Sequence, residues 1–179
     1  MATTTTTTTE VTFETTLGRC AVRWSDRGIT SVLLPGREPR LGPRIEDDPD
    51  VPAYVRDAIT GMTAVLSGEA VDLRVIPIDH REIDDFRRAV YAATREIPAG
   101  TTRSYGEVAR NLSLDRRDGA RDVGAALAKN PTPILVPCHR VVGADGKLTG
   151  FSAPGGLATK RRMLELEGAP GYGQQLLFG

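Results

Sequence analysis

The sequence predicts an α+β protein in which a small antiparallel sheet comes first and a mostly helical part follows. Two observations carry this prediction. Within residues 11–34 apolar residues alternate with polar ones and then form a short apolar run, as in strands, whereas from residue 86 onward they recur every three or four positions, as in helices. The 179 residues are 40% hydrophobic, which is enough for one compact domain or two small ones packed together.

The chain begins with a threonine-rich leader, residues 1–10, that we expect to be disordered because residues 3–9 have no apolar side chain to bury. Three apolar stretches behind it define the strands of a small meander: Val11/Phe13, Cys20/Val22/Trp24 and residues 29–34, with turn residues at 25–28. Cys20 falls on the same face as Val22 and Trp24, so we interpret it as a small buried core residue.

The rest of the N-terminal part is predicted to be a loop, a helix and one more strand. Residues 35–50 are rich in Pro, Gly and acids, which is typical of a loop. Four apolar residues at helical spacing then mark a helix that Gly68 is placed to end: Val55, Ile59, Met62 and Leu66. Residues 73–78 are predicted to form a strand. The N-terminal α+β domain then covers residues 11–80, with its boundary in residues 79–85, where four acids fall within seven positions.

The second part is predicted to be helical. One amphipathic helix, stopped by Pro98 and Gly100, is marked by Phe86, Val90, Ala93 and Ile97. Ser104 and Glu107 then have the spacing of a capping box, which opens a short helix. A polar turn over residues 113–119 leads to a second short helix over residues 120–129. Two short helices joined in this way have the geometry of a helix-turn-helix.

The formal net charge of zero hides an asymmetry along the chain. Residues 1–85 hold 9 Lys/Arg and 15 Asp/Glu, a balance of −6, whereas residues 86–162 hold 14 and 6, a balance of +8. Residues 163–179 add −2. Such an asymmetry between halves indicates that the second part faces a polyanion.

The sequence shows neither an apolar run of membrane-spanning length nor a secretory pattern, so we expect a cytoplasmic protein with no membrane partner. Its two cysteines, Cys20 and Cys138, lie far apart, which argues against a disulfide and leaves at least one thiol available. Together with His80 and His139 they are the only soft ligand candidates, and their spacing matches no zinc pattern.

Cys138 has the most informative neighbourhood. Residues 134–136, which we expect to be a short buried strand, lead into Pro137, Cys138, His139 and Arg140. A thiolate is the reactive form of cysteine, and nearby cations lower the thiol pKa, while an imidazole can accept the proton. From these residues alone, a nucleophile and an inert buried cysteine beside a core histidine remain alternatives.

Residues 130–142, continued by residues 143–150 and 155–157, resemble the O6-alkylguanine-DNA alkyltransferases, whose signature is Pro-Cys-His-Arg. The resemblance extends over residues 86–168, nearly half the chain, and includes residues 103–106, 121–124 and 160–168. It implies a ribonuclease H-like layout for the N-terminal domain, a DNA-binding and alkyl-transfer domain over residues 86–168, and a tail over residues 169–179.

The activity implied by the resemblance is direct-reversal DNA repair. The alkyl group of O6-alkylguanine in double-stranded DNA is transferred irreversibly to Cys138, once per molecule, and activity on O4-alkylthymine is left open. The resemblance implies a monomer that needs no cofactor and no metal and associates with the nucleoid when bound to DNA. S-Alkylcysteine is a thioether, which water does not readily cleave.

The resemblance also assigns the roles of individual residues. Cys138 is the nucleophile, His139 its base through a water molecule, Glu167 the residue that orients His139, and Tyr105 the proton donor to the leaving guanine. Asn130 and Arg140 support the site. Arg121 is the finger that replaces the flipped base, because a stacked guanine must leave the duplex to react. The remaining assignments are DNA contacts at Ser104, Tyr105, Ala120 and Gly124, and pocket residues Val141, Phe151, Ser152 and Gly155.

Four features depart from the family pattern. Asp122 places a negative charge beside Arg121, Phe151 replaces a usual Tyr, and Tyr91 replaces a usual Trp. Residues 152–154 lengthen the loop before Gly155, a loop that bears on the preferred alkyl size and on the contact of Ser152.

Three other functions compete with this interpretation. An alkyltransferase-like protein would flip the lesion without reacting, but such proteins replace the cysteine that is present here. A helix-turn-helix regulator with Cys138 as a sensor would need a second sensory domain. A cysteine hydrolase would leave the basic asymmetry unexplained.

Overall fold

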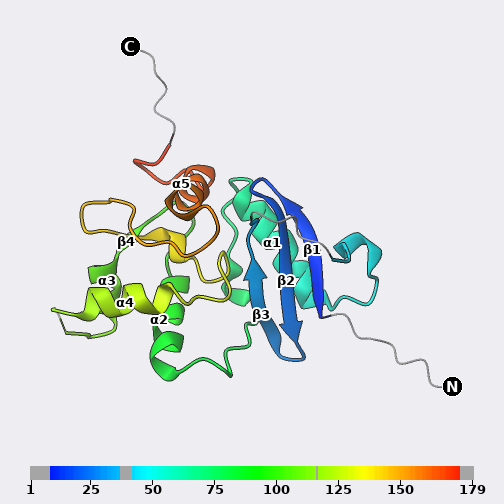
Figure 1. Cartoon of the computed structure of the whole chain (residues 1–179), viewed down its shortest axis with the longest axis horizontal. Coiled ribbons are helices and arrows are strands. Elements are labelled where there is room, and N and C mark those ends of the chain that lie inside the picture. The colour runs from blue at the N-terminus through cyan, green and yellow to red at the C-terminus, as the bar shows by residue number, and fades with distance from the viewer. Residues whose placement is uncertain (1–8, 37–41, 116, 174–179) are drawn as a thin grey trace, which may run out of the picture.

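The structure of the chain is a computed structural model that describes residues 9–36, 42–115 and 117–173. A sheet with one helix behind it occupies one side of the molecule, and a group of short helices occupies the other (Figure 1). This arrangement confirms the predicted α+β class with a mostly helical C-terminal part.

The sheet is the predicted three-stranded antiparallel meander, with strand order β1-β2-β3. Its strands are β1 (Glu10–Thr15), β2 (Gly18–Ser25) and β3 (Gly28–Leu33). Cys20, Val22 and Trp24 are all buried, as the alternation predicted. Residues 1–8 of the predicted leader lie outside the described residues, but Glu10 is not part of a disordered segment, because it pairs with Arg23 in the sheet.

The predicted helix behind the sheet is α1 (Ala53–Leu66). Of the predicted loop before it, residues 37–41 lie outside the described residues, and η1 (Ile45–Asp47) forms one short 3-10 turn within the remainder. The prediction of a strand at residues 73–78 is wrong. Residues 73–75 form a 3-10 turn, η2 (Leu73–Val75), because the Asp72 side chain accepts a hydrogen bond from the backbone N–H of Arg74. Within the described part of the chain, residues 73–78 pair with the sheet through a single bridge from Ile78 to Ile29.

The helical part consists of α2 (Asp85–Arg95), α3 (Tyr105–Asn111) and α4 (Gly119–Leu127). The capping box predicted from Ser104 and Glu107 is present at the start of α3, and α3 packs against α4 as the two helices of the predicted helix-turn-helix. A two-residue parallel pairing joins β4 (Arg103–Ser104) to β5 (Val141–Val142). None of the described helices has the length and apolar character that crossing a membrane requires.

Two segments near the cysteine differ from the expectation. The buried strand predicted at residues 134–136 does not form, because Ile134 adopts a left-handed conformation (φ 74°) that interrupts an extended chain. The reactive segment follows as a 3-10 turn, η3 (Cys138–Arg140). Residues 156–166, for which no helix is predicted, form α5 (Gly156–Leu166), a helix that contacts both α1 and η3.

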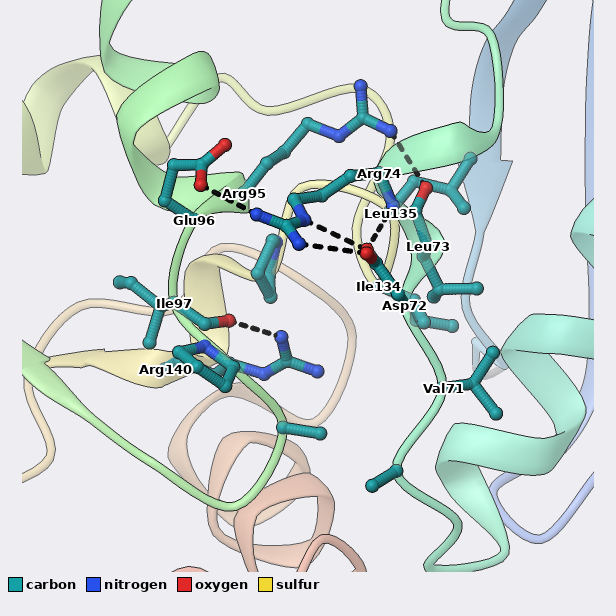
Figure 2. Close-up of a pocket in the computed structure, with 14 residues that line it drawn as sticks. Val71, Asp72, Leu73, Arg74, Arg95, Glu96, Ile97, Ile134, Leu135 and Arg140 are labelled. Atoms are coloured by element: carbon teal, nitrogen blue, oxygen red, sulfur yellow. Dashed lines mark hydrogen bonds and ion pairs between the residues drawn. The ribbon is translucent and has the colours of Figure 1, made fainter.

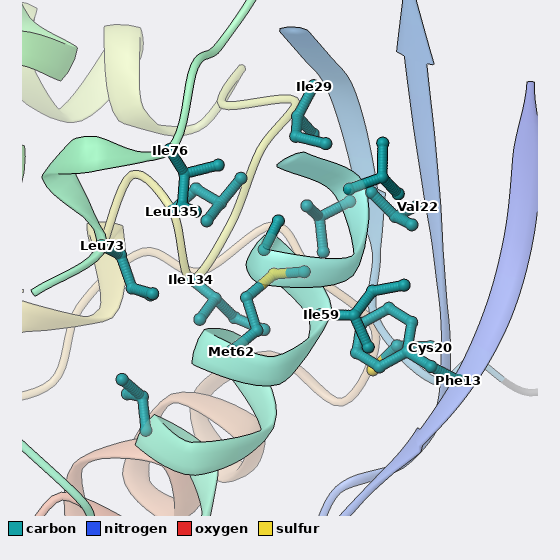
Figure 3. Close-up of a cluster of buried hydrophobic side chains, with 14 of the residues drawn as sticks. Phe13, Cys20, Val22, Ile29, Ile59, Met62, Leu73, Ile76, Ile134 and Leu135 are labelled. Carbon is teal, nitrogen blue, oxygen red and sulfur yellow. The ribbon is translucent and has the colours of Figure 1, made fainter. Parts of the chain in front are cut away.

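The two parts of the chain share a hydrophobic core. Ile134, Leu135 and Met163 come from the C-terminal part, yet they are buried in the cluster formed by the sheet and α1. Figure 3 shows Met62 of α1 with Ile134 and Leu135 on one side and Cys20, Val22 and Phe13 of the sheet on the other. This packing fixes the segment that precedes Cys138 against the N-terminal sheet domain.

Candidate active site

Cys138 lies half-buried at the start of η3, where its backbone N–H donates to the carbonyl of Val136 over 2.8 Å. It opens into a cavity of about 630 Å³. The lining comes from α3, from α4 and the residues just after it, from Cys138 and from residues 149–152: Tyr105, Ala120, Arg121, Gly124, Leu127, Ala128, Asn130, Cys138, Thr149, Gly150, Phe151 and Ser152. The cavity therefore joins the thiol to the helix-turn-helix.

His139, the next residue, points away from solvent and contacts Glu167. Its Nε2 lies 2.8 Å from Oε1 of Glu167, and both side chains are fully buried. An ionised carboxylate can only accept, so Nε2 carries the proton and Nδ1 has the free lone pair. Among the described residues Nδ1 has no hydrogen-bond partner. The geometry thus leaves one basic nitrogen available beside the thiol-bearing residue.

Arg140 holds Glu167 from the other side. Its Nε and Nη2 donate to the two carboxylate oxygens over 3.0 and 2.8 Å, and its Nη1 donates to the carbonyl of Ile97 over 2.6 Å. The backbone N–H of Gly100 also donates to Glu167, over 3.3 Å. A carboxylate held by two charged hydrogen bonds and a backbone amide has a fixed orientation.

The bond from Arg140 to Ile97 borders a second cavity, of about 260 Å³, between the N-terminal domain and α2 (Figure 2). On the opposite rim Arg74 donates to both Asp72 and Glu96, which ties η2 to the end of α2. Arg95 spans the same gap and donates to the carbonyls of Leu73 and Ile76. These contacts tie the N-terminal domain to the end of α2, next to Ile97.

The electrostatics fit a neutral histidine next to an ionised glutamate. Burial alone would raise the pKa of Glu167, but His139 and Arg140 lower it to about 2. Burial lowers the pKa of His139, against the influence of Glu167. Burial also raises the pKa of the Cys138 thiol, while Asn130 and the charge of Lys160 oppose that rise. The thiol consequently needs a base to ionise near neutral pH.

Asn130 organises the loop that carries the cysteine. Its Nδ2 donates to the carbonyl of Val136 over 2.9 Å, and its Oδ1 accepts from the backbone N–H of Thr132 over 3.0 Å. Both ends of the amide are thus used to close residues 130–136 into a compact turn. The supporting role that the resemblance implies for Asn130 stays a prediction.

Tyr105 faces the thiol across the cavity. Its hydroxyl donates to the carbonyl of Thr149 over 2.9 Å and accepts from Nζ of Lys160 over 3.2 Å. Burial raises the pKa of Tyr105. Sequence reasoning missed Lys160. Its spacing was a usable signal, because Lys160 lies three residues before Met163 and four before Leu164, on the same buried face of α5.

Arg121 projects from α4 at the rim of the same cavity, with 79% of its side chain exposed. Its guanidinium pairs with Asp118 over 2.7 Å. Asp122 does not share that rim, since it lines a separate groove with Phe86, Arg87 and Lys129. The negative charge that departs from the family pattern is therefore turned toward α2.

The other predicted site residues divide into two groups. Ala120, Gly124, Phe151 and Ser152 line the cavity with Cys138, and Ser152 Oγ donates to the carbonyl of Ala128 over 2.7 Å. Ser104, Val141 and Gly155 are not among the lining residues. Ser104 caps α3, the Val141 side chain is buried in the helical core, and Gly155 precedes α5 with φ 84°. The roles of these residues stay predictions.

Gly155 has a conformational reason to be glycine. A Cβ there would lie 2.2 Å from Oγ1 of Thr159, and the left-handed backbone disfavours a side chain as well. Its position at the start of α5 thus depends on local backbone geometry.

Within the described part of the chain, no group of three or more His, Cys, Asp or Glu side chains is placed to hold a metal ion.

Comparison with known proteins gives a consistent result. Residues 85–169 match the family model of the DNA-binding domain of 6-O-methylguanine DNA methyltransferase. The methylated-DNA–protein-cysteine methyltransferase of Methanosarcina acetivorans is 42% identical over 118 residues, which cover 65% of this chain and 70% of that protein. The enzyme of the same name from Mycobacterium tuberculosis H37Rv is 44% identical over 116 residues, 65% of this chain and 67% of that protein.

Solved structures agree over most of the chain. The crystal structure of Mycobacterium tuberculosis OGT in complex with DNA has a TM-score of 0.70 at 34% identity, and the match covers 91% of this chain and 96% of that one. The O6-methylguanine-DNA methyltransferase of Pyrococcus kodakaraensis shares the fold, with a TM-score of 0.67 at 24% identity over 89% of this chain and 99% of that one. With the Cys138 segment, the buried His139–Glu167 pair and these matches in place, the chain belongs to the methylated-DNA–protein-cysteine methyltransferase family.

Proposed function

We propose that this protein repairs O6-alkylguanine in double-stranded DNA by moving the alkyl group to Sγ of Cys138, once per molecule. The observation that carries the proposal is the single cavity that places Cys138, Tyr105 and Arg121 together. It offers a nucleophile, a donor for the leaving base and a cation at the rim. Next to the nucleophile, the buried group of His139, Glu167 and Arg140 provides a base and the residues that hold it.

The first requirement of the reaction is a thiolate. Because burial raises the pKa of Cys138, the thiol does not ionise unaided near neutral pH. Nδ1 of His139 is the available base, since Nε2 is committed to Glu167. When His139 accepts the proton, directly or through one water molecule, the ionised Glu167 stabilises the imidazolium. Arg140 keeps the carboxylate in place.

The second requirement is a stabilised leaving group. As the bond between the alkyl carbon and O6 breaks, negative charge builds up on the purine, and a donor placed for that charge helps most in the transition state. Tyr105 Oη is such a donor on the cavity wall. Its hydrogen turns from the carbonyl of Thr149 to a ring nitrogen of the guanine.

The third requirement is access to the base. A guanine inside a duplex must rotate out of the stack, at a cost of a few kcal/mol. Arg121, exposed on α4, is positioned to occupy the gap after leaving Asp118. The backbone carbonyls of Cys138 and Val141 and the loop at Ser152 would then read the guanine edge, while phosphate contacts to other basic residues give salt-dependent binding.

One turnover per molecule follows from the product. A thioether is not displaced by water under mild conditions, and the described site has no second thiol to take over the alkyl group, because Cys20 is buried in the core of the sheet domain. We expect the conversion of O6-methylguanine to guanine within an oligonucleotide to plateau at one equivalent per protein, however large the excess of substrate. Quantifying the restored guanine in the oligonucleotide against protein concentration checks this, and conversion that continues beyond one equivalent would contradict it.

A protein that only binds and marks the lesion is the main alternative. It would protect the lesion without producing guanine, so the same measurement separates the two functions: no guanine at all would indicate a binding module. A cysteine hydrolase would leave the oligonucleotide unchanged and would not need the exposed Arg121 at the cavity rim.

A further inference from the structure

Lys160 of α5 is a fully buried lysine, and no carboxylate pairs with it among the described residues. A buried ammonium without a counter-ion is costly and is retained only where its hydrogen bonds are satisfied. Here they are. Nζ donates to the carbonyl of Val141 over 2.6 Å, to the carbonyl of Thr149 over 3.0 Å and to Oη of Tyr105 over 3.2 Å.

The partners of Lys160 are groups of the alkyl-transfer site. Tyr105 is the proposed donor to the leaving guanine, and Thr149 is both a lining residue and the acceptor of the Tyr105 hydroxyl. Val141 provides a carbonyl proposed to read the guanine edge. Nζ also lies 5.5 Å from the centre of the Tyr105 ring. The single ammonium therefore fixes the position of Tyr105 relative to the two backbone carbonyls.

We propose that Lys160 is a positioning residue that orients Tyr105 and supplies the positive charge and the proton that guanine departure requires. This inference rests on the proposed function. Lys160 acts through Tyr105, since Nζ is not among the atoms that line the cavity.

The thiolate electron pair of Cys138 forms the S–C bond, the C–O6 bond breaks, and its electron pair stays on guanine. Tyr105 gives its hydroxyl proton to a ring nitrogen of that anion and becomes a tyrosinate. Lys160 gives a proton to Oη, which restores the tyrosine and leaves a neutral amine that solvent later reprotonates. No oxidant or cofactor is involved.

The charge state of Lys160 supports this route. Burial lowers its pKa to about 8, while Cys138 opposes that shift, so the ammonium is present at neutral pH and can lose a proton readily. Because Tyr105 has a raised pKa, its own ionisation does not intervene in the same pH range. A thiolate at Cys138 and an ammonium at Lys160 also attract each other.

The experiment compares two alkyl donors on the same thiol. Iodoacetamide releases iodide, which needs no proton, whereas O6-benzyl-9-methylguanine releases a purine anion and has no ionisable N9–H. In the wild-type protein, the ratio of the purine rate to the iodoacetamide rate cancels the thiolate fraction. We expect this ratio to fall at least tenfold between pH 7 and pH 9.5, with a midpoint near the pKa of about 8 of Lys160. A ratio that stays flat overturns the proposal.

Variants test the same point. We expect Lys160→Met to lower the purine rate by about 100-fold, the usual cost of one transition-state donor. Its iodoacetamide rate, measured at a pH where the thiol is ionised, should stay within threefold of wild type. Lys160→Gln, which keeps two donors, should recover part of the loss. Lys147→Met, at an exposed lysine paired with Asp145, is the matched control and should leave both rates unchanged.

A double-mutant cycle shows whether Lys160 acts through Tyr105. If it does, Lys160→Met should cost much less in a Tyr105→Phe background than in the wild type. Equal costs in the two backgrounds, or equal losses with both alkyl donors, would reduce Lys160 to a structural role and overturn the inference. If wild-type protein reacts with iodoacetamide but with neither benzylated purine nor O6-methylguanine DNA, the proposed function itself fails.

Discussion

Glu167→Gln is expected to destabilise the fold by about 3–5 kcal/mol, the cost of removing one partner of a buried ion pair. Arg140 would be left as a buried guanidinium facing a neutral amide, and His139 would lose the acceptor that sets its tautomer. We expect the midpoint of chemical unfolding to fall accordingly, and alkyl transfer to slow even where the variant is folded. Glu165→Gln, whose partner Arg162 is half exposed, is the control on the same helix and should change stability by less than about 1 kcal/mol.

The ionised Glu167 also predicts that the stability of the fold depends on pH. The pKa of Glu167 is about 2 in the folded protein, below its ordinary value of 4.5. The folded state therefore binds this proton less readily than the unfolded state, so the stabilisation is fully present above pH 4.5 and is lost as the pH falls toward 2. The difference in unfolding free energy between wild type and Glu167→Gln should shrink across that window. A difference independent of pH between 5 and 2 would contradict the ionised assignment.

Arg121→Ala should lower the repair rate in duplex DNA by about 100-fold, because the finger offsets a base-flipping cost of a few kcal/mol. A free benzylated guanine needs no flipping, so its reaction with the same variant should stay within twofold of wild type. Arg19→Ala removes an equal charge from the sheet domain, where Arg19 pairs with Glu14, and controls for the general effect of charge on DNA binding. Equal losses on the two substrates would show that Arg121 has no role in flipping.

Local sequence signals predicted the local elements well. Strand alternation marked β1 and β2, a short apolar run marked β3, helical spacing marked α1 and α2, and the Ser104/Glu107 pair marked the start of α3. Each of these signals lies within one element. The errors arose where a single hydrogen bond or backbone conformation determines the local structure. At Asp72 a side-chain hydrogen bond produces the turn η2, and at Ile134 a left-handed backbone interrupts the predicted strand.

The site itself depends on contacts that no local pattern contains. Glu167 is 28 residues from His139 in the sequence, and the resemblance predicted their contact where periodicity could not. Lys160 was missed because its acceptors are backbone carbonyls and a hydroxyl brought in by separate segments. The packing of Ile134, Leu135 and Met163 into the sheet domain was also not foreseen, since it joins segments from both halves of the chain.

The most direct test of alkyl transfer is the mass of the protein after incubation with an oligonucleotide that carries O6-methylguanine. We expect one added methyl group per protein, located by peptide mapping on the peptide that contains Cys138. Cys20→Ala should gain the same mass, because Cys20 is a core residue, whereas Cys138→Ser should gain none. An unchanged mass in the wild-type protein, or a methyl group on any residue other than Cys138, would contradict the account.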